Sequence, residues 1–287
     1  MTGPGLHWLA SYPKSGNTWF RVVLRAYLDG ADDEIDLNRL QTGLIGSSRL
    51  WVDDVVGFDT ADLYPSEIDR MRPLAYRWYA LQDGFGGYHK IHDAFLRNDD
   101  GAPLVDPQAT NGAVYIVRNP LDIVPSLAAH LSITLDEAVD VMGNPDAALA
   151  NTARGLNPQL RQRLCTWSGH VESWVDATEI PVHVLRYEDM HGTPREAFAA
   201  ALAFLGLRGE DERVARAISL AGFDRLVHLE TTRGFRERPA SMARFFRSGR
   251  TGDWRSTLQE RQVARIVSDH APVMQRFGYL DKDGEPV

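Results

Sequence analysis

Short apolar runs alternate with amphipathic stretches along this chain. Residues 6–10 (LHWLA) are apolar and end in a polar turn, and residues 18–28 carry apolar side chains at helical spacing. Residues 113–117 (AVYIV) form a continuous β-branched run, which is typical of a buried parallel strand, and Pro120 then suits the first turn of a helix. Further elements are predicted as strands at residues 87–91 and 182–187 and as a helix at residues 194–205.

The alternation of strands and helices indicates the fold class. We expect an α/β fold of three layers, with helices on both faces of a central parallel sheet, formed by a single domain over residues 1–287. Residues 32–82 and 231–255 lack this pattern, and we interpret them as insertions on the acceptor side and as a lid. A last helix is predicted over residues 256–277. Ligands of open parallel sheets bind beyond the carboxyl ends of the strands, so the chemistry is expected there.

Composition and charge narrow the class of protein. The chain has 287 residues, of which 44% are hydrophobic and 24% charged, as in ordinary globular proteins. A formal net charge of -8 argues against general nucleic-acid binding, so a bound anion must be held by a local site. Cys165 is the only cysteine, which excludes an intrachain disulfide, and the sequence contains no recognisable leader or bilayer-spanning run. We therefore expect a cytoplasmic protein without a membrane partner.

The turn after the first predicted strand has the composition of a phosphate-binding loop. Of 31 basic residues only three are lysines, and Lys14 lies in this turn. Lysine is a compact point charge, which suits a small and crowded oxyanion. Gly16 allows close approach, Ser15 and Thr18 offer hydroxyls, and the start of the next helix presents N–H donors. A P-loop kinase would need a Gly-Lys pair, which this chain lacks.

The segment YPKSGNTW around this turn resembles the 5′-phosphosulfate-binding loop of the sulfotransferase family. Members of that family use 3′-phosphoadenosine 5′-phosphosulfate (PAPS) as the sulfuryl donor. The resemblance implies a P-loop-like strand-loop-helix and a catalytic role for Lys14 at the departing phosphate oxygen. It implies that the donor is bound here by Lys14, Ser15, Gly16, Asn17, Thr18 and Trp19.

The segment YIVRNPLDIVPSLAAH resembles part of the family's 3′-phosphate site. Arg118 ends a predicted strand and Ser126 follows eight residues later, which is the family spacing. A guanidinium and a hydroxyl near a helix start also suit a phosphate dianion on physical grounds. Pro125 departs from the pattern, because proline inside a helix removes a hydrogen bond. The alternative for Arg118 is a local ion pair with Asp122.

The segment FFRSGRTGDW resembles the late 3′-phosphate motif of the family. Arg247 and Gly249 match that motif, whereas Ser248 replaces a lysine. Residues 231–250 carry six arginines against one acidic residue in a chain of negative net charge. This excess favours an anion-binding lid over a merely solvated loop.

Four further residues are assigned by the resemblance. In YHKIHDAF, Lys90 and His92 match a lysine and the histidine that acts as the base, and residues two apart in a strand point to the same side. A single histidine is more often structural, but a second of the three lysines beside it favours catalysis. Tyr187 in RYEDM and Phe223 in AGFDRL match residues near the adenine.

Six aromatic residues crowd the region of residues 51–79, where the resemblance places the acceptor. They predict either helix packing or an apolar pocket for a small acceptor. The six are Trp51, Phe58, Tyr64, Tyr76, Trp78 and Tyr79.

The resemblance implies that the protein moves a sulfuryl group from PAPS to a hydroxyl or an amine of a small acceptor, aromatic or of natural-product type. His92 would take the acceptor proton and Lys90 would face the sulfuryl oxygens, without a metal. Neither a metal-ligand cluster nor a dinucleotide fingerprint is found in the sequence. Two alternatives are a non-catalytic module that binds 3′-phosphoadenosine nucleotides and a P-loop-type nucleotide kinase. A homodimer is left open.

Overall fold

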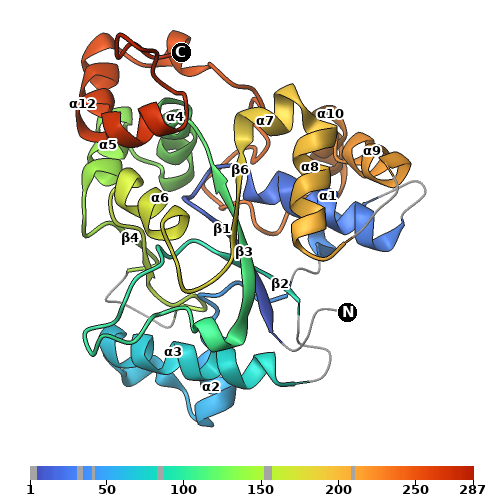
Figure 1. The fold of residues 1–287 in the computed structure, drawn as a ribbon, viewed down its shortest axis with the longest axis vertical. Helices are drawn as coiled ribbons and strands as arrows, with labels where there is room; N and C mark the ends of the chain where they lie inside the picture. Colours follow the sequence, from blue (N-terminus) through green and yellow to red (C-terminus); the bar gives the residue numbers. More distant parts are fainter. Residues whose placement is uncertain (1–4, 31–34, 41–42, 83–86, 152–156, 208–210) are drawn as a thin grey trace. The chain divides into compact units, whose positions relative to one another are not determined.

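The protein is described by a computed structural model over residues 5–30, 35–40, 43–82, 87–151, 157–207 and 211–287. A central sheet has the strand order β2-β1-β3-β6 (Figure 1). Its strands are β1 (Leu6–Ser11), β2 (Tyr88–Ile91), β3 (Thr110–Val117) and β6 (Val182–Arg186). β1 pairs in parallel with both β2 and β3. The α/β class with a central parallel sheet is thereby confirmed.

Burial explains why the two middle strands are the most apolar. All six residues of β1 are buried, as are the last six residues of β3. A strand covered on both faces needs apolar side chains on both, which produces a continuous run and not an alternating pattern. β2 at the edge alternates between half-buried and buried positions. This weaker pattern is the reason why the sequence predicts β2 less strongly.

The chain divides into two compact units. The first comprises Met1–Tyr12, Thr42–Val117 and Met142–Val184, and the second comprises Pro13–Gln41, Arg118–Val141 and Leu185–Val287. The chain passes into the second unit at the ends of β1 and β3 and within β6. The motifs that begin with Lys14, Arg118 and Tyr187 follow these three points.

The first unit contains α2 (Arg49–Val56), α3 (Pro65–Ala80) and α6 (Trp167–Val175), together with the short strands β4 (Ala148–Leu149) and β5 (Gln162–Arg163). The expected insertion at residues 32–82 is therefore helical over much of its described length; residues 32–34 and 41–42 lie outside the described residues. Pro65 starts α3, and the Glu67 carboxylate accepts the Tyr64 N–H at 2.8 Å. Proline at the first position and this cap explain why the helix begins there.

Three of the six aromatic residues are core residues that join α2 to α3. Trp51 packs edge-on against Tyr76 and Tyr79, with ring centroids 5.4 and 4.5 Å away. All three side chains are buried, whereas those of Phe58, Tyr64 and Trp78 are exposed. Helix packing, the first of the two alternatives for this region, is therefore correct for the buried three.

The second unit is largely helical. It contains α1 (Asn17–Asp29), α4 (Pro120–Leu131), α7 (Tyr187–Gly192), α8 (Pro194–Phe204), α9 (Asp211–Leu220), α10 (Phe223–Arg233), α11 (Trp254–Thr257) and α12 (Glu260–Arg276). α5 (Leu135–Gly143) spans the boundary of the two units. The predicted start of the last helix at residue 256 is wrong. Leu258 is extended, and a new helix begins at Glu260, where Gln259 and Gln262 form a capping box.

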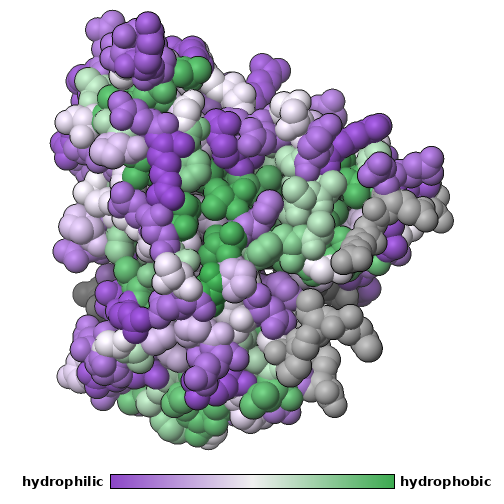
Figure 2. All heavy atoms as spheres, viewed as in Figure 1, coloured by the Kyte–Doolittle hydropathy of each residue, from purple (hydrophilic) through white to green (hydrophobic). Residues whose placement is uncertain are grey.

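Apolar side chains lie among polar ones on the surface of the first unit, as Figure 2 shows at its lower edge. Leu50, Leu74 and Trp78 are exposed there. Across the described ranges, no helix combines the length and the apolar character that a membrane span requires.

Candidate functional site

The loop from Pro13 to Gly16 turns the chain from β1 into α1. Lys14 has φ 70°, a left-handed conformation that costs energy for any residue but glycine. Gly16 has φ 100°, which glycine adopts without this cost, and it caps α1. A Cβ atom on Gly16 would lie 2.4 Å from Cδ2 of Tyr187. The loop therefore needs glycine for its backbone and for its contact with this ring.

The hydroxyls of this loop are placed for an anion. Ser15 and Thr18 are buried, and Thr18 lies in the first turn of α1. The Ser15 hydroxyl is buried and has no hydrogen-bond partner among the described residues. An orphaned buried hydroxyl beside the unpaired N–H groups of a helix start fits a bound phosphate.

Arg118 binds the same loop from the end of β3. Its NH1 group donates to the Lys14 carbonyl at 3.0 Å, and its NH2 group donates to the Arg250 carbonyl at 3.0 Å. Its Cζ lies 4.2 Å from the centroid of the Tyr187 ring. Its Nε is buried and has no partner in the described part of the chain, so one donor is left for a ligand.

The alternative that Arg118 pairs with Asp122 is not what the structure contains. The Asp122 carboxylate accepts the N–H groups of Gly252 and Trp254 at 2.7 and 3.1 Å. Asp122 thereby fixes the end of the arginine-rich segment, residues 231–255, to the first turn of α4.

Helix α4 continues through Pro125 to Leu131, so the proline does not end it. Arg247 donates from NH1 to the Pro125 carbonyl at 2.7 Å. Ser126, the next residue, is half-buried on α4. The structure thus brings Arg247 close to the helix turn that carries Ser126.

The late motif is packed against the start of α10. Gly249 has φ 62°, and a Cβ atom there would lie 2.1 Å from Cδ2 of Phe223. The Ser248 hydroxyl donates to the Asp253 carboxylate. Phe223 and Gly249, which the sequence assigns to the nucleotide separately, are therefore in contact.

Two acidic residues hold the arginine-rich segment. The Glu230 carboxylate accepts the N–H groups of Phe245 and Phe246 at 2.7 and 3.0 Å. Glu237 pairs with Arg21 of α1 at 2.8 Å. Phe245 lies under the Lys14 ammonium, whose Nζ is 4.2 Å from the ring centroid. Whether the segment opens and closes as a lid stays a prediction.

An aromatic group surrounds Tyr187 at the start of α7. The Trp19 ring lies 6.0 Å from that of Tyr187 and 4.6 Å from that of His191. Burial raises the pKa of Tyr187, although Arg118 opposes this shift. Tyr187 therefore stays a neutral ring between the loop and the guanidinium.

The first unit contains Lys90 and His92. Lys90 is half-buried in β2, where it pairs in register with Leu9 of β1. His92 follows the strand and is buried. Its Nδ1 lies 2.8 Å from the Ser11 carbonyl oxygen and 3.3 Å from the Ser11 hydroxyl. A carbonyl only accepts, so we assign the proton to Nδ1, which leaves Nε2 as the acceptor of the neutral ring.

A second histidine supports the first through the backbone. Nε2 of His170 donates to the His92 carbonyl at 3.0 Å, and Nδ1 of His170 accepts from the Tyr115 hydroxyl at 2.9 Å. Burial lowers the pKa of His170 to about 4, although its backbone hydrogen bonds oppose the shift. His170 is therefore neutral at pH 7, as this bonding pattern requires.

A cavity of about 350 Å³ lies in the first unit and is polar. Its lining includes Asp69, Arg161, Arg163 and Cys165. The apolar acceptor pocket expected from the sequence stays a prediction. Among the described residues, no group of three His, Cys, Asp or Glu side chains is arranged for a metal ion.

Sequence reasoning missed Ser11, Asp122 as a loop anchor, and Phe245. Asp122 lies in the motif with Arg118, but its partners lie 130 residues or more away along the chain. Phe245 is the first residue of the FFRSGRTGDW segment, and an aromatic residue beside an arginine-rich loop is the signal that the sequence offers. Ser11 binds His92 mainly through its backbone carbonyl, and since every residue has such a carbonyl, the sequence does not single it out.

The chain matches known proteins over most of its length. A family model described as the sulfotransferase domain matches residues 108–278, more than half of the chain. These residues include Arg118, Ser126, Tyr187, Phe223 and Arg247, whereas Lys14, Lys90 and His92 precede them. Cytosolic sulfotransferase 16 of Arabidopsis thaliana is 25% identical and is aligned over 90% of this chain and 72% of its own length.

Solved structures share the fold. Mouse sulfotransferase SULT7A1, solved in complex with PAP, superposes with a TM-score of 0.59 at 18% identity, over 96% of this chain and 89% of its own. Retinol dehydratase, solved with androsterone and the inactive cofactor PAP, has a TM-score of 0.59 at 18% identity, over 96% and 82%. The family model and the curated relatives favour sulfuryl transfer over a kinase or a binding module.

Proposed function

This chain belongs to the sulfotransferase family, and we propose that it transfers the sulfuryl group of PAPS to a hydroxyl or an amine of a small-molecule acceptor. The relatives named as cytosolic sulfotransferases support a cytosolic location for this chain as well. The solved structures that hold PAP support PAPS as the donor, and the androsterone and retinol present in two of these complexes support a small acceptor.

The donor half of the proposal rests on one observation. The Tyr187 ring lies close to Gly16 of the loop, and the guanidinium of Arg118 lies over the same ring. Two orphaned buried polar atoms, the Ser15 hydroxyl and Arg118 Nε, belong to this group. Bound PAPS would supply an activated sulfuryl group, whose bond to the phosphate oxygen breaks as the bond to the acceptor forms. Ser15 to Thr18 would hold the 5′-phosphate, and Arg118, Ser126 and the late motif (Arg247, Ser248 and Gly249) would hold the 3′-phosphate.

The acceptor half rests on His92. With its proton on Nδ1, the neutral ring would use Nε2 to take the proton of the acceptor, which is the role of a general base. Lys14 and Lys90 would stabilise charge on the leaving phosphate oxygen and on the sulfuryl oxygens. Because sulfuryl transfer depends on positioning and charge stabilisation, we propose that the reaction needs no metal.

The test is incubation with labelled PAPS and a broad panel of alcohols, phenols and amines, with mass detection of the added sulfuryl group. We expect transfer to at least one acceptor. The His92→Ala variant should bind PAP with near wild-type affinity and lose transfer to alcohols, because the base acts on the acceptor and not on the donor. If this variant sulfates the best alcohol within a few-fold of the wild-type rate, His92 is not the base.

A further inference from the structure

The peptide His92–Asp93 is held from several sides. The His92 ring binds the end of β1 through the Ser11 carbonyl. The His92 carbonyl accepts from His170 of α6, and the Asp93 carbonyl accepts from Nε1 of Trp174 at 3.0 Å on the same helix. Any base at this position inherits its orientation from these contacts, because a ring is only as fixed as the backbone that carries it.

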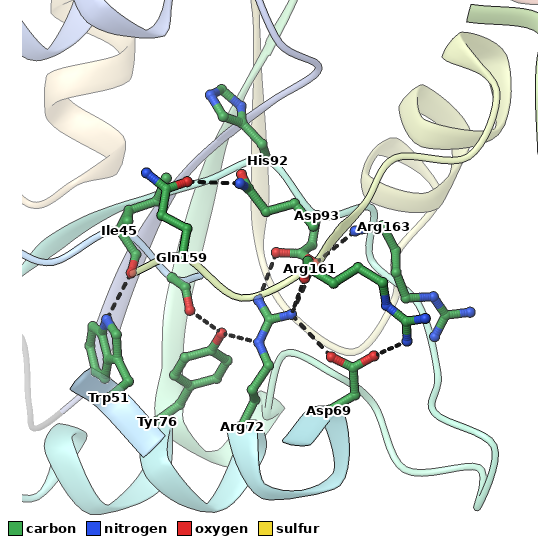
Figure 3. A network of polar contacts seen from close by, with 12 residues as sticks. Ile45, Trp51, Asp69, Arg72, Tyr76, His92, Asp93, Gln159, Arg161 and Arg163 are labelled. Carbon is green, nitrogen blue, oxygen red and sulfur yellow. Dashed lines mark hydrogen bonds and ion pairs between the residues drawn. The ribbon is translucent and has the colours of Figure 1, made fainter. Parts of the chain in front are cut away.

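The Asp93 carboxylate is the strongest of these anchors. Nitrogens NH1 and NH2 of Arg72 donate to its two oxygens at 3.0 and 2.7 Å, which is the bidentate arrangement (Figure 3). The N–H of Arg163 adds a third bond, at 3.0 Å to Oδ1. The side chains of Arg72 and Asp93 have 0% exposed surface. Two hydrogen bonds from a planar guanidinium to one carboxylate fix both the distance between the two groups and their relative orientation.

Arg72 is itself fixed by other groups of the first unit. Its Nε donates to the Tyr76 hydroxyl at 3.0 Å, which donates to the Gly46 carbonyl at 2.6 Å. Its NH1 also contacts the Asp69 carboxylate at 3.4 Å, and Arg161 pairs with that carboxylate at 2.6 Å. Figure 3 shows Asp69, Arg72, Tyr76 and Arg161 in one connected network that includes Asp93, the residue after His92. The network therefore links α3 rigidly to the residue that follows His92.

A contribution to folding stability does not by itself explain the buried ion pair of Arg72 and Asp93. Moving two charges from water into the interior costs several kcal/mol, and well-packed apolar residues often replace a buried ion pair without loss of stability. What apolar residues cannot replace is the directed, two-point hold on the Asp93 carboxylate. We propose that Arg72 is a positioning residue, which acts through Asp93 to keep the His92 ring oriented on the Ser11 carbonyl. This inference rests on the proposed role of His92 as the base.

The test compares Arg72→Lys with Arg77→Lys in the full chain. Arg77 lies on the same helix and donates from Nε alone to Asp106 at 2.6 Å, so its variant controls for an arginine-to-lysine change in α3 that removes no bidentate pair. Lysine keeps the charge but not the bidentate geometry. We expect Arg72→Lys to lower kcat about ten- to hundred-fold at the best acceptor, with PAP affinity unchanged, and Arg77→Lys to leave kcat within two-fold.

A second measurement does not depend on activity. The ¹⁵N chemical shifts of the His92 ring, assigned by their absence in His92→Ala, report which nitrogen holds the proton. We expect the Nδ1–H form in the wild type and in Arg77→Lys, and a mixture of forms with a shifted pH profile in Arg72→Lys. If Arg72→Lys does not fold, Asp93→Asn, which keeps the shape and one acceptor oxygen, takes its place.

The two proposals fail separately. Unchanged His92 shifts and unchanged kcat in a folded Arg72→Lys protein would overturn the positioning role. If the His92 shifts change in Arg72→Lys but His92→Ala keeps full activity, Arg72 does orient the histidine, and the proposal that His92 is the base is wrong.

Discussion

The guanidinium of Arg118 lies over the ring of Tyr187, with Cζ 4.2 Å from the ring centroid. Gly16 lies so close to the same ring that a Cβ atom would be 2.4 Å from it. The loop, the arginine and the tyrosine begin after three different strands, yet they form one group within the second unit.

Arg118→Ala and Arg247→Ala should mainly weaken binding of nucleotides that carry a 3′-phosphate. A charge-assisted contact contributes about 1.5 to 3 kcal/mol, or roughly ten- to a hundred-fold in Kd. Calorimetric titration with PAP and with adenosine 5′-phosphosulfate, which lacks that phosphate, measures the difference. Equal losses for both nucleotides would mean that these arginines do not read the 3′-phosphate.

Gly16→Ala should damage the loop, because the new Cβ would clash with Tyr187 and because φ 100° strains any other residue. We expect a loss of about 1 to 3 kcal/mol in stability and a clear loss of PAP affinity. Gly192→Ala is the matched control, since a Cβ at this α7 residue meets open space. Thermal unfolding and PAP titration compare the two, and equal behaviour would contradict the close contact.

Lys14→Ala should lower the chemical step strongly, because a charge aimed at the leaving oxygen acts mainly in the transition state. Alanine accepts φ 70° no worse than lysine does, so the backbone strain of the loop is unchanged. Lys14→Arg should restore little, because the fork is too large for this loop. Single-turnover rates measure both variants. A wild-type rate for Lys14→Ala would remove the residue from catalysis, and recovery in Lys14→Arg would show that charge alone suffices.

Acid should destabilise the protein through His170. Burial lowers the pKa of this histidine from 6.5 to about 4, so between these values the unfolded chain binds more protons than the folded one. Stability is therefore full above pH 6.5 and falls as the pH drops toward 4, by about 2 kcal/mol between pH 7.5 and 5. Urea unfolding at the two pH values should show a smaller pH dependence in His170→Gln than in the wild type. An unchanged dependence would exclude His170 as its source. His270, whose pKa burial also lowers to about 4, should contribute a separate part.

Most of the regular elements near the site were predictable because their signals are local. The β-branched run of β3, the proline at the start of α4 and the loop around Gly16 each lie within a few consecutive residues. The start of α12 was missed because the turn at Leu258 and the cap at Gln259 follow a short helix with the same polarity. A helical pattern does not reveal a break that leaves its periodicity intact.

Local patterns suffice to predict the strand-loop-helix with Lys14, the spacing of Arg118 and Ser126, and the arginine excess of residues 231–250. The residues that each side chain contacts follow only from the folded arrangement. Arg118 donates to backbone carbonyls and not to Asp122. Trp51 and Tyr76 pack α2 against α3, and Arg72 forms a bidentate ion pair with Asp93. The reason is physical: backbone conformation follows from neighbouring residues, whereas many donors compete for each acceptor. Which donor binds depends on distances that the fold sets and that separation along the chain does not.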